Sequence, residues 1–216
     1  MLAQNFHCYP IDSTYTPDNI LLTQHLKFTI NQHTVIQGNS GAGKSSLLRT
    51  VAGLWENFDG TIGKPFQIGS GGLFFLPQKS YMPLGTLRDA VIYPHKVSEK
   101  SDQEILACMR YAAIDFVLER YSLDSVEIWD KVLSFGEVQR LAFARLFYHK
   151  PKYAILDEST SALDVENEQK VMESCVHQGI LLVSVAHRES VERFHQYRLL
   201  LDGKSGWKIQ ESVLRL

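Results

Sequence analysis

The sequence predicts an α/β fold in which a mostly parallel sheet forms the core and a helical segment is inserted into it. Two observations indicate this class. Short apolar segments typical of strands alternate with helical segments over most of the chain. From about residue 98 to residue 150 the pattern is instead helical throughout.

The first strands are expected within residues 26–37, LKFTINQHTVIQ, where apolar and polar residues alternate around short runs. A helix is then expected from Ser45 to Leu54, because a glycine turn precedes it and Gly53 is a typical helix stop. The apolar run GGLFFLPQ, bounded by glycine and proline, predicts a buried strand that ends near Gln78.

The helical segment begins with a capping-box pair, Ser101 and Glu104, ahead of ILACMRYAAIDFVL. We expect amphipathic helices over 101–120 and 137–148, with their apolar faces forming the interior of this segment. Further along the chain, YAILDE and GILLVSVAH predict strands with a helix between them. RLLLDGKSGWKIQ predicts a hairpin that turns at Gly203–Gly206.

Composition argues against several classes of protein. The 216 residues carry a formal net charge of −2, which gives no general reason to expect nucleic-acid binding. The 3 cysteines are widely spaced and the 8 histidines form no HExxH or paired Cys/His pattern, so we expect reduced thiols and no structural metal. The N-terminus does not resemble a signal peptide, and no apolar run reaches about eighteen residues. We therefore expect that this chain does not span a bilayer by itself.

The stretch GNSGAGKS matches the phosphate-binding pattern GxxxxGK[ST]. Glycines permit positive φ and close backbone approach, so successive N–H groups can surround an anion, and the following helix points its positive end at the same place. In this pattern Lys44 pairs with β- and γ-phosphate oxygens and the Ser45 hydroxyl coordinates Mg²⁺. An incidental glycine turn is the alternative, but this match lies between a predicted strand and a predicted helix, as the pattern requires. The predicted nucleotide contacts in this stretch are Gly38, Asn39, Ser40, Gly41, Ala42, Gly43, Lys44, Ser45 and Ser46.

Two acidic residues end the predicted strand YAILDE. Asp157 is expected to lie near the metal, and Glu158 is expected to polarise an attacking water. An acidic pair that only caps a strand is the alternative, and on its own the pattern is weak. Its occurrence behind a matched glycine stretch favours the catalytic interpretation.

Four further segments resemble a known family. LSFGEVQR, Leu133 to Arg140, resembles the LSGGQ-type signature of ATP-binding-cassette (ABC) proteins, and it precedes ARLFYHKPKYAILDE as in that family. Gln78 is similar to the family's Q-loop, SALD (Ser161–Asp164) to its D-loop, and His187 to its switch histidine. Because these segments occur in the family's order over nearly the whole chain, the sequence is identified as an ABC nucleotide-binding domain.

The resemblance implies a single domain, 1–216, with a P-loop NTPase core and a helical signature subdomain. The core would comprise about 1–78 and 151–216, including an N-terminal antiparallel β portion. The signature subdomain would comprise about 79–150.

The resemblance also implies ATP and Mg²⁺ as cofactors, bound between two domains that pair head to tail. The glycine stretch of one domain would face the signature of a second, identical or homologous domain. Ser134, the N–H groups around Gly136, and Glu137 would then contact nucleotide held by the other domain, and Asp164 would reach across the interface.

Within one domain the resemblance assigns further roles. Glu158 would be the catalytic base, His187 would contact the γ-phosphate, and Gln78 would sense metal and nucleotide. Ser45, Gln78 and Asp157 would be the residues at the metal.

This sequence departs from the family pattern in the signature, where Phe135 replaces the usual glycine. If only the backbone N–H matters, a side chain that points away is tolerated, and we favour this alternative; if Phe135 faces the nucleotide, the site is weakened. The aromatic residue that stacks on adenine is also open. Tyr15 is the candidate, but the usual position before the proline is Thr16, and Tyr9 is a second possibility.

Phrases such as SSLLRTVAGLW and SVAHRESVERFH resemble subfamily D, which holds peroxisomal acyl-CoA and lysosomal cobalamin half-transporters, and related bacterial peptide and vitamin B12 transporters. The resemblance implies a transmembrane domain, fused or separate, as partner. It places this chain at the cytoplasmic face of a bacterial inner membrane, or of a peroxisomal or lysosomal membrane. Tyr81, Met82, Pro83 and Leu84 would either dock that partner or pack between the core and the helical segment.

Two other functions fit the sequence less well. A soluble ABC ATPase acting on nucleic acid or ribosomes usually has a second cassette, a coiled-coil insertion or basic tracts, and none is visible in the sequence. A P-loop kinase or GTPase does not fit the signature, and the NKxD-type guanine motif is absent. The leading expectation is an ATPase domain that drives a half-transporter.

Overall fold

The computed structural model describes residues 2–8, 28–29, 32–55, 58–63, 72–204 and 206–212. Its centre is a 6-stranded sheet in the order β11-β10-β3-β9-β8-β5. Only β10 and β11 pair antiparallel, and every other neighbouring pair in this sheet is parallel. The strands are β3 (Thr34–Gly38), β5 (Leu73–Leu76), β8 (Tyr153–Asp157), β9 (Leu181–Val185), β10 (Tyr197–Leu201) and β11 (Trp207–Glu211).

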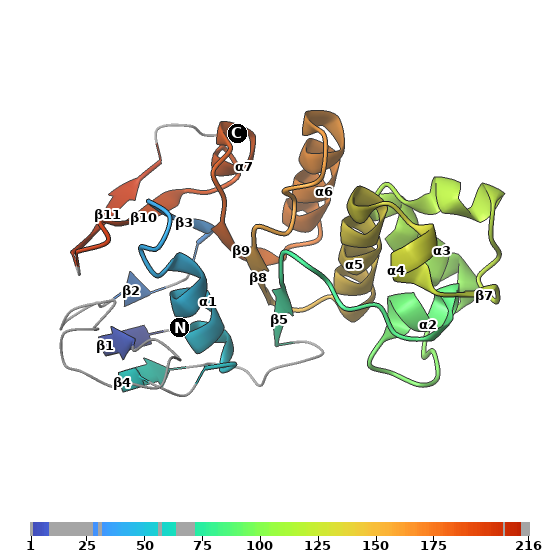
Figure 1. Cartoon of the computed structure of the whole chain (residues 1–216), viewed down its shortest axis with the longest axis horizontal. Helices are drawn as coiled ribbons and strands as arrows, with labels where there is room; N and C mark the ends of the chain where they lie inside the picture. The colour runs from blue at the N-terminus through green and yellow to red at the C-terminus, as the bar shows by residue number, and fades with distance from the viewer. Residues whose placement is uncertain are drawn as a thin grey trace.

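A second, 3-stranded sheet is antiparallel, in the order β2-β1-β4. It consists of β1 (Leu2–Cys8), β2 (Phe28–Thr29) and β4 (Phe58–Gly63), and it lies beside α1 in Figure 1. The predicted α/β class, with a mostly parallel sheet and an N-terminal antiparallel portion, is therefore confirmed. A short pairing of β6 (Gly85–Thr86) with β7 (Val126–Glu127) lies far from both sheets.

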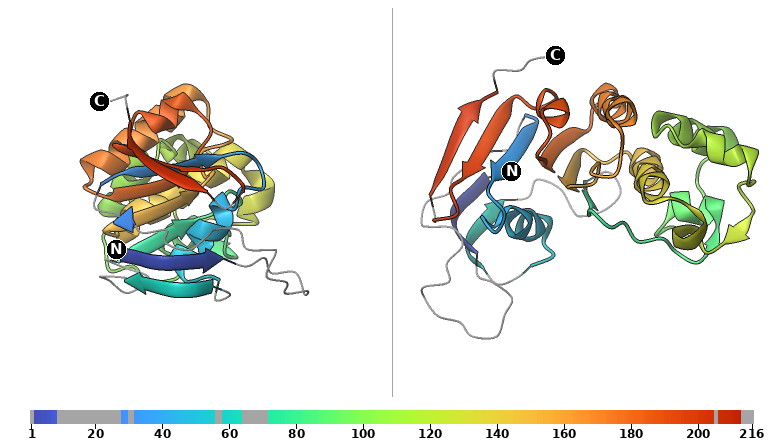
Figure 2. Two further views of the ribbon diagram at one scale, coloured as in Figure 1. Left: turned by 90° about the vertical axis from the view of Figure 1, so that its left-hand side faces the viewer. Right: turned by 45° about the horizontal axis from the view of Figure 1, so that its top comes forward.

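Most helices gather at one end of an elongated molecule (Figures 1 and 2). There lie α2 (Leu87–Ile92), α3 (Asp102–Tyr111), a 3₁₀ helix (Asp115–Glu119), α4 (Trp129–Val132) and α5 (Phe135–His149). The other helices are α1 (Lys44–Ala52), α6 (Val165–His177) and α7 (Glu189–Glu192). Within the described residues, no helix combines the length and apolar character needed to cross a membrane.

The main sheet separates two apolar clusters. Successive residues of a strand point to opposite faces, so Val35 packs with α5 and α6 while Ile36 packs with α1. α5 is buried along most of its length, and Leu141 and Phe143 are fully inaccessible to solvent. This helix therefore connects the sheet to the helical end of the molecule.

The expected helix over 101–120 is wrong in its second half. α3 begins after Ser101 with the predicted capping box, but it ends at Tyr111. Ala113 then takes a positive φ of 52°, and the 3₁₀ helix follows. The turn still brings Ile114 and Val117 into the apolar cluster, so the apolar spacing continues across a break that periodicity alone cannot reveal.

Candidate nucleotide-binding site

The glycine stretch forms a loop between β3 and α1. Gly38 has a φ of 151°, and a Cβ there would lie 2.3 Å from the carbonyl oxygen of Leu201 on β10, so the position requires glycine. Gly43 is the N-cap of α1 with a φ of 84°, and it has no side chain with which to cap the helix. The first N–H groups of α1 therefore point into the loop, where an anion can accept from them.

Lys44 lies across this loop. Its Nζ donates to the carbonyl oxygens of Gly38 at 2.9 Å and Asn39 at 3.0 Å, and the residue is only 7% exposed. An ammonium group has three donors, so the third remains for an anion in the loop.

Ser45 and Asp157 join α1 to the end of β8. The Ser45 hydroxyl donates to Asp157 Oδ1 at 2.7 Å, and Arg49 forms an ion pair with Oδ2 at 3.7 Å. Asp157 is buried, with 4% exposure. A hydroxyl and a carboxylate that converge in this way supply the oxygen ligands that Mg²⁺ prefers.

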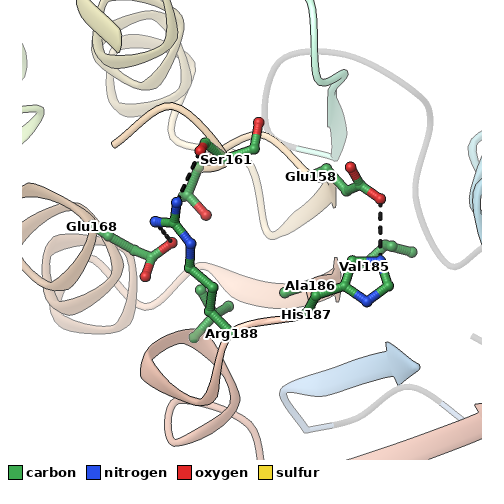
Figure 3. Close-up of a pocket in the computed structure, with 9 residues that line it drawn as sticks. Glu158, Ser161, Glu168, Val185, Ala186, His187 and Arg188 are labelled. Carbon is green, nitrogen blue, oxygen red and sulfur yellow. Dashed lines mark hydrogen bonds and ion pairs between the residues drawn. The ribbon is translucent and has the colours of Figure 1, made fainter. Parts of the chain in front are cut away.

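Glu158 follows directly and is contacted from two sides. Gln78 Nε2 donates to its Oε2 at 3.1 Å, and His187 Nε2 lies 3.4 Å from its Oε1. Figure 3 shows the Glu158–His187 pair from the ends of β8 and β9. The three side chains thus come together from segments far apart in the sequence.

A cavity of about 280 Å³ joins the loop to these side chains. Its lining residues are Ser40, Gly41, Gly43, Lys44, Ser45, Ser46, Glu158 and His187. Asp157 and Gln78 do not line it, but they are hydrogen-bonded to Ser45 and Glu158, which do. The cavity can hold an anion against backbone N–H groups with an acid and an imidazole at its edge.

The signature segment begins α5. Ser134 is the N-cap, and it forms a capping box in which its hydroxyl accepts from Glu137 N at 3.3 Å and Glu137 Oε2 accepts from Ser134 N at 2.7 Å. Burial raises the pKa of Glu137, but these bonds and an ion pair with Arg120 at 2.5 Å outweigh it, so its pKa is lowered. Phe135 is 48% exposed at the start of the helix. Gly136 lies against the loop after Glu158, where a Cβ would be 3.0 Å from the carbonyl oxygen of Ala162.

The residues predicted to serve a second domain do not reach this cavity. Ser134, Gly136, Glu137 and Asp164 are absent from its lining. Asp164 is the N-cap of α6, and hydrogen bonds from the backbone and side chain of Asn167 lower its pKa. In Figure 1, α1 and α5 lie on opposite sides of β8. The adenine candidates Tyr15 and Tyr9 lie outside the described residues, as does Thr16.

Sequence reasoning missed two side chains that hold the loop after Glu158. Arg188 donates to the carbonyl oxygen of Leu163 at 2.7 Å. It also donates to the carbonyl oxygen of Ser161 at 3.0 Å and pairs with the buried Glu168 at 3.5 Å (Figure 3). Gln139 contacts the same loop from α5. The sequence feature that could have pointed to Gln139 is an amide on the otherwise apolar face of a predicted helix. For Arg188 the only such feature is its position next to His187.

Comparisons with known proteins show what this chain is similar to. A family model described as ABC transporter matches residues 23–161. ATP-binding cassette sub-family D member 3 of Rattus norvegicus is 44% identical over 204 residues, covering 91% of this chain and 30% of that protein. The lysosomal cobalamin transporter ABCD4 of Mus musculus is 42% identical over 192 residues, covering 85% of this chain and 32% of that protein.

A solved structure is also similar. The structure of a bacterial Atm1-family ABC exporter with ATP bound matches with a TM-score of 0.72 at 26% identity, covering 94% of this chain and 38% of that chain. This chain thus spans roughly a third of the length of the curated relatives described above.

Proposed function

The chain belongs to the ABC transporter family as an ATPase domain, and we propose that it drives a membrane half-transporter through nucleotide-dependent head-to-tail pairing. The observation that carries the proposal is the cavity at the glycine loop. It is lined by Lys44, Ser45, Glu158 and His187, and it has no lining residue from the signature segment. In this proposal the cavity is the nucleotide-binding half of a site, and the signature segment of the same chain serves nucleotide held by a second domain.

ATP would bind with its phosphates in the glycine loop. Lys44 and the N–H groups at the start of α1 supply positive charge there. Ser45, Asp157 and Gln78 would hold Mg²⁺, and the partly buried contact between the Ser45 hydroxyl and the Asp157 carboxylate fits that ion. When bound, Mg²⁺ supplies charge neutralisation and orientation of the phosphate oxygens.

Hydrolysis would depend on Glu158 as the base toward water. Its carboxylate faces the cavity and is held by Gln78 at Oε2 and by His187 at Oε1. These contacts fix the carboxylate in one orientation, and positioning of the nucleophile is the main contribution a protein makes to phosphoryl transfer. His187 also lines the cavity, so it can donate to the terminal phosphate.

The missing half of the site would come from a second nucleotide-binding domain, in a homodimer or a heterodimer. Ser134 and Gly136 lie at the N-terminal end of α5, where helix N–H groups favour an anion. Glu137 holds the capping box closed, and Asp164 caps α6 at the exposed edge of the adjoining loop. Phe135 is exposed at this helix start, as both alternatives for its side chain require.

A transmembrane domain, fused or separate, would dock beside β5. A groove of about 290 Å³ lies there, lined mainly by aromatic and aliphatic side chains of residues 73–77 with Tyr81 and Tyr93. Met82 packs on the apolar core, whereas Tyr81 is 61% exposed and Leu84 is 81% exposed. In this proposal the exposed side chains of residues 81–84 would contact the partner. The domain would lie at the cytoplasmic face of its membrane, with cobalamin, acyl-CoA or peptide as the class of cargo. The similarity to a lysosomal cobalamin transporter supports the first class.

The pairing is tested with Glu158→Gln. This change keeps the size of the side chain but removes the base, so ATP should bind and close the pair without turnover. We expect sedimentation velocity with ATP and Mg²⁺ to show a dimer for Glu158→Gln. Lys44→Ala, which removes the cation of the loop, should stay monomeric under the same conditions.

A matched control is Glu166→Gln, a change of the same kind at an exposed position of α6. It should behave as the unmodified chain. A Glu158→Gln variant that stays monomeric with saturating ATP would contradict the head-to-tail pairing. Unchanged ATP affinity in Lys44→Ala would contradict the phosphate site itself.

A further inference from the structure

Gln139 is a buried amide, 1% exposed, in the first turns of α5. Its Nε2 donates to the carbonyl oxygen of Gln78 at 3.1 Å and to the hydroxyl of Ser161 at 3.3 Å. Its Oε1 accepts from the backbone N–H of Ala162 at 3.0 Å. One side chain of the signature helix is therefore bonded to both loops that approach Glu158.

These loops continue to Glu158 itself. On one side, the side chain of Gln78 donates to Glu158 Oε2 at 3.1 Å. On the other side, the backbone N–H of Ser161 donates to the carbonyl oxygen of Glu158 at 3.1 Å. The bonds form a closed ring from Gln139 through Gln78, Glu158 and Ser161 back to Gln139.

The first turn of α5 also touches the loop directly. Gly136 is close enough to Ala162 that a Cβ would meet its carbonyl oxygen at 3.0 Å. Packed elements move as discrete units. A shift of the first turn of α5 would therefore move the loop after Glu158 through the contact between Gly136 and Ala162. The same shift would move Gln78 through its hydrogen bond with Gln139.

We propose that Gln139 is a positioning residue that orients the Glu158 carboxylate and links it to the signature turn. This rests on the proposed function, in which Glu158 acts on nucleotide in one site while the signature turn of the same chain serves the other site. Gln139 then makes the orientation of the base depend on whether the signature turn is engaged. An amide suits this role at neutral pH, because one planar group donates to the carbonyl oxygen of Gln78 and accepts from the N–H of Ala162.

Two variants separate the parts of the ring. Gln139→Met is similar in size and removes every hydrogen bond. Gln139→Glu keeps an acceptor for Ala162 N–H and for the Ser161 hydroxyl, but its carboxylate cannot donate to the carbonyl oxygen of Gln78. Gln169→Met is the matched control, because Gln169 is an amide on α6 bonded to Glu173 outside the ring.

The first measurement is steady-state ATP hydrolysis by the chain. We expect Gln139→Met to lower kcat by about tenfold or more with KM for ATP changed less than about twofold, because misplacement of the base affects turnover and the glycine loop is untouched. Gln139→Glu should lower kcat as well, and its kcat relative to the unmodified chain should rise as pH falls, since the protonated acid can donate to Gln78 again. Gln169→Met should match the unmodified chain.

The second measurement, hydrogen exchange at the Ala162 amide, needs no turnover. Gln139→Met should accelerate this exchange, while Gln169→Met should not. If the unmodified chain hydrolyses no ATP, the proposed function is overturned. Hydrogen exchange at the Ala162 amide would then still show whether Gln139 holds the loop after Glu158. Normal hydrolysis with unchanged kcat in Gln139→Met, a loss confined to KM, or unchanged exchange at Ala162 would overturn this inference alone.

Discussion

Glu158 has a backbone φ of 50°, in the left-handed region that non-glycine residues adopt uncommonly. Its N–H donates to Val185 of β9 and its carbonyl oxygen accepts from Ser161, so the turn is held from both ends. Such a conformation costs about 1–3 kcal/mol and persists where surrounding contacts determine it. The turn takes the chain off the end of β8 and brings the carboxylate to the cavity at the glycine loop.

The residues of the glycine loop were predictable from sequence because their geometry is set by neighbours in the chain. Lys44 bonds to carbonyl oxygens 6 and 5 residues away. Gln139 was not predictable, because its partners lie 61 and 23 residues away and depend on how α5 meets the sheet. Motif order made Gln78 and His187 candidates, and their roles stay predictions; only the fold shows that both contact Glu158.

His195 predicts a dependence of stability on pH. Its imidazole is fully buried, between the Ser184 hydroxyl at 2.9 Å and the carbonyl oxygen of Val191 at 2.9 Å, and burial lowers its pKa to about 3 from 6.5. The native state therefore keeps His195 neutral while the unfolded chain takes up a proton below pH 6.5. The stability from this group is complete above pH 6.5 and is lost as pH falls toward 3, by about 1.4 kcal/mol per pH unit.

Urea unfolding at a series of pH values checks this. His195→Gln should be less stable than the unmodified chain near neutral pH, because the site is built for imidazole, and its stability should fall less steeply in acid. The difference between the two proteins should thus narrow as pH is lowered. His177→Gln, at an exposed position of α6, is the control and should follow the unmodified chain. Parallel curves for His195→Gln would contradict the prediction.

At the scale of elements, the start of α3 was better predicted than its end. The capping box at Ser101 was visible in the sequence, and the structure forms it with Glu104. The end of α3 was not visible, because the turn at Ala113 uses no glycine or proline and the apolar spacing continues beyond it. The division into a core of about 1–78 and 151–216 and a helical part of about 79–150 stays a prediction.

Ser134 and Ser101 make a matched pair of helix caps with different expected functions. Each hydroxyl accepts from the N–H three residues later, and each is paired with a glutamate there. Ser101→Ala and Ser134→Ala should therefore each lower the free energy of unfolding by about 1 kcal/mol. Only Ser134→Ala should also lower ATP hydrolysis, because only that helix start is expected to face nucleotide.

Unfolding by denaturant and steady-state hydrolysis measure the two effects separately. Equal losses of hydrolysis in both variants would indicate that helix fraying explains the effect. No loss in Ser134→Ala would indicate that the serine hydroxyl caps α5 and does nothing for nucleotide.

At the scale of the whole molecule, the glycine loop and the signature lie on different parts of an elongated chain. The cavity contains the first and none of the second, and α1 and α5 lie on either side of β8 (Figure 1). A head-to-tail pair with two-fold symmetry would bring each loop to the other chain's signature, giving two equivalent sites. In such a pair, one mutation can disable the glycine loop of a chain and leave its signature intact, and another mutation can do the reverse.

Mixing two inactive variants tests that arrangement. Lys44→Ala removes the loop cation, and Ser134→Glu places a negative charge where the terminal phosphate of the other chain's ATP would lie. Because an acidic residue is favourable at a helix N-terminus, Ser134→Glu should still fold. Each variant alone should hydrolyse little ATP. In a mixed pair, the intact loop of the Ser134→Glu chain meets the intact signature of the Lys44→Ala chain, so one complete site forms. We expect an equimolar mixture to hydrolyse ATP although neither variant does so alone, and this recovered rate should rise with total protein concentration.

A mixture that stays as inactive as its components would contradict this expectation, provided that unmodified chains at the same concentrations hydrolyse ATP. Two explanations would then remain. Either the loop and the signature serve the same chain, or both sites of a pair must be intact for turnover. ATP-dependent sedimentation of the mixture distinguishes these outcomes, because only the second still gives mixed dimers.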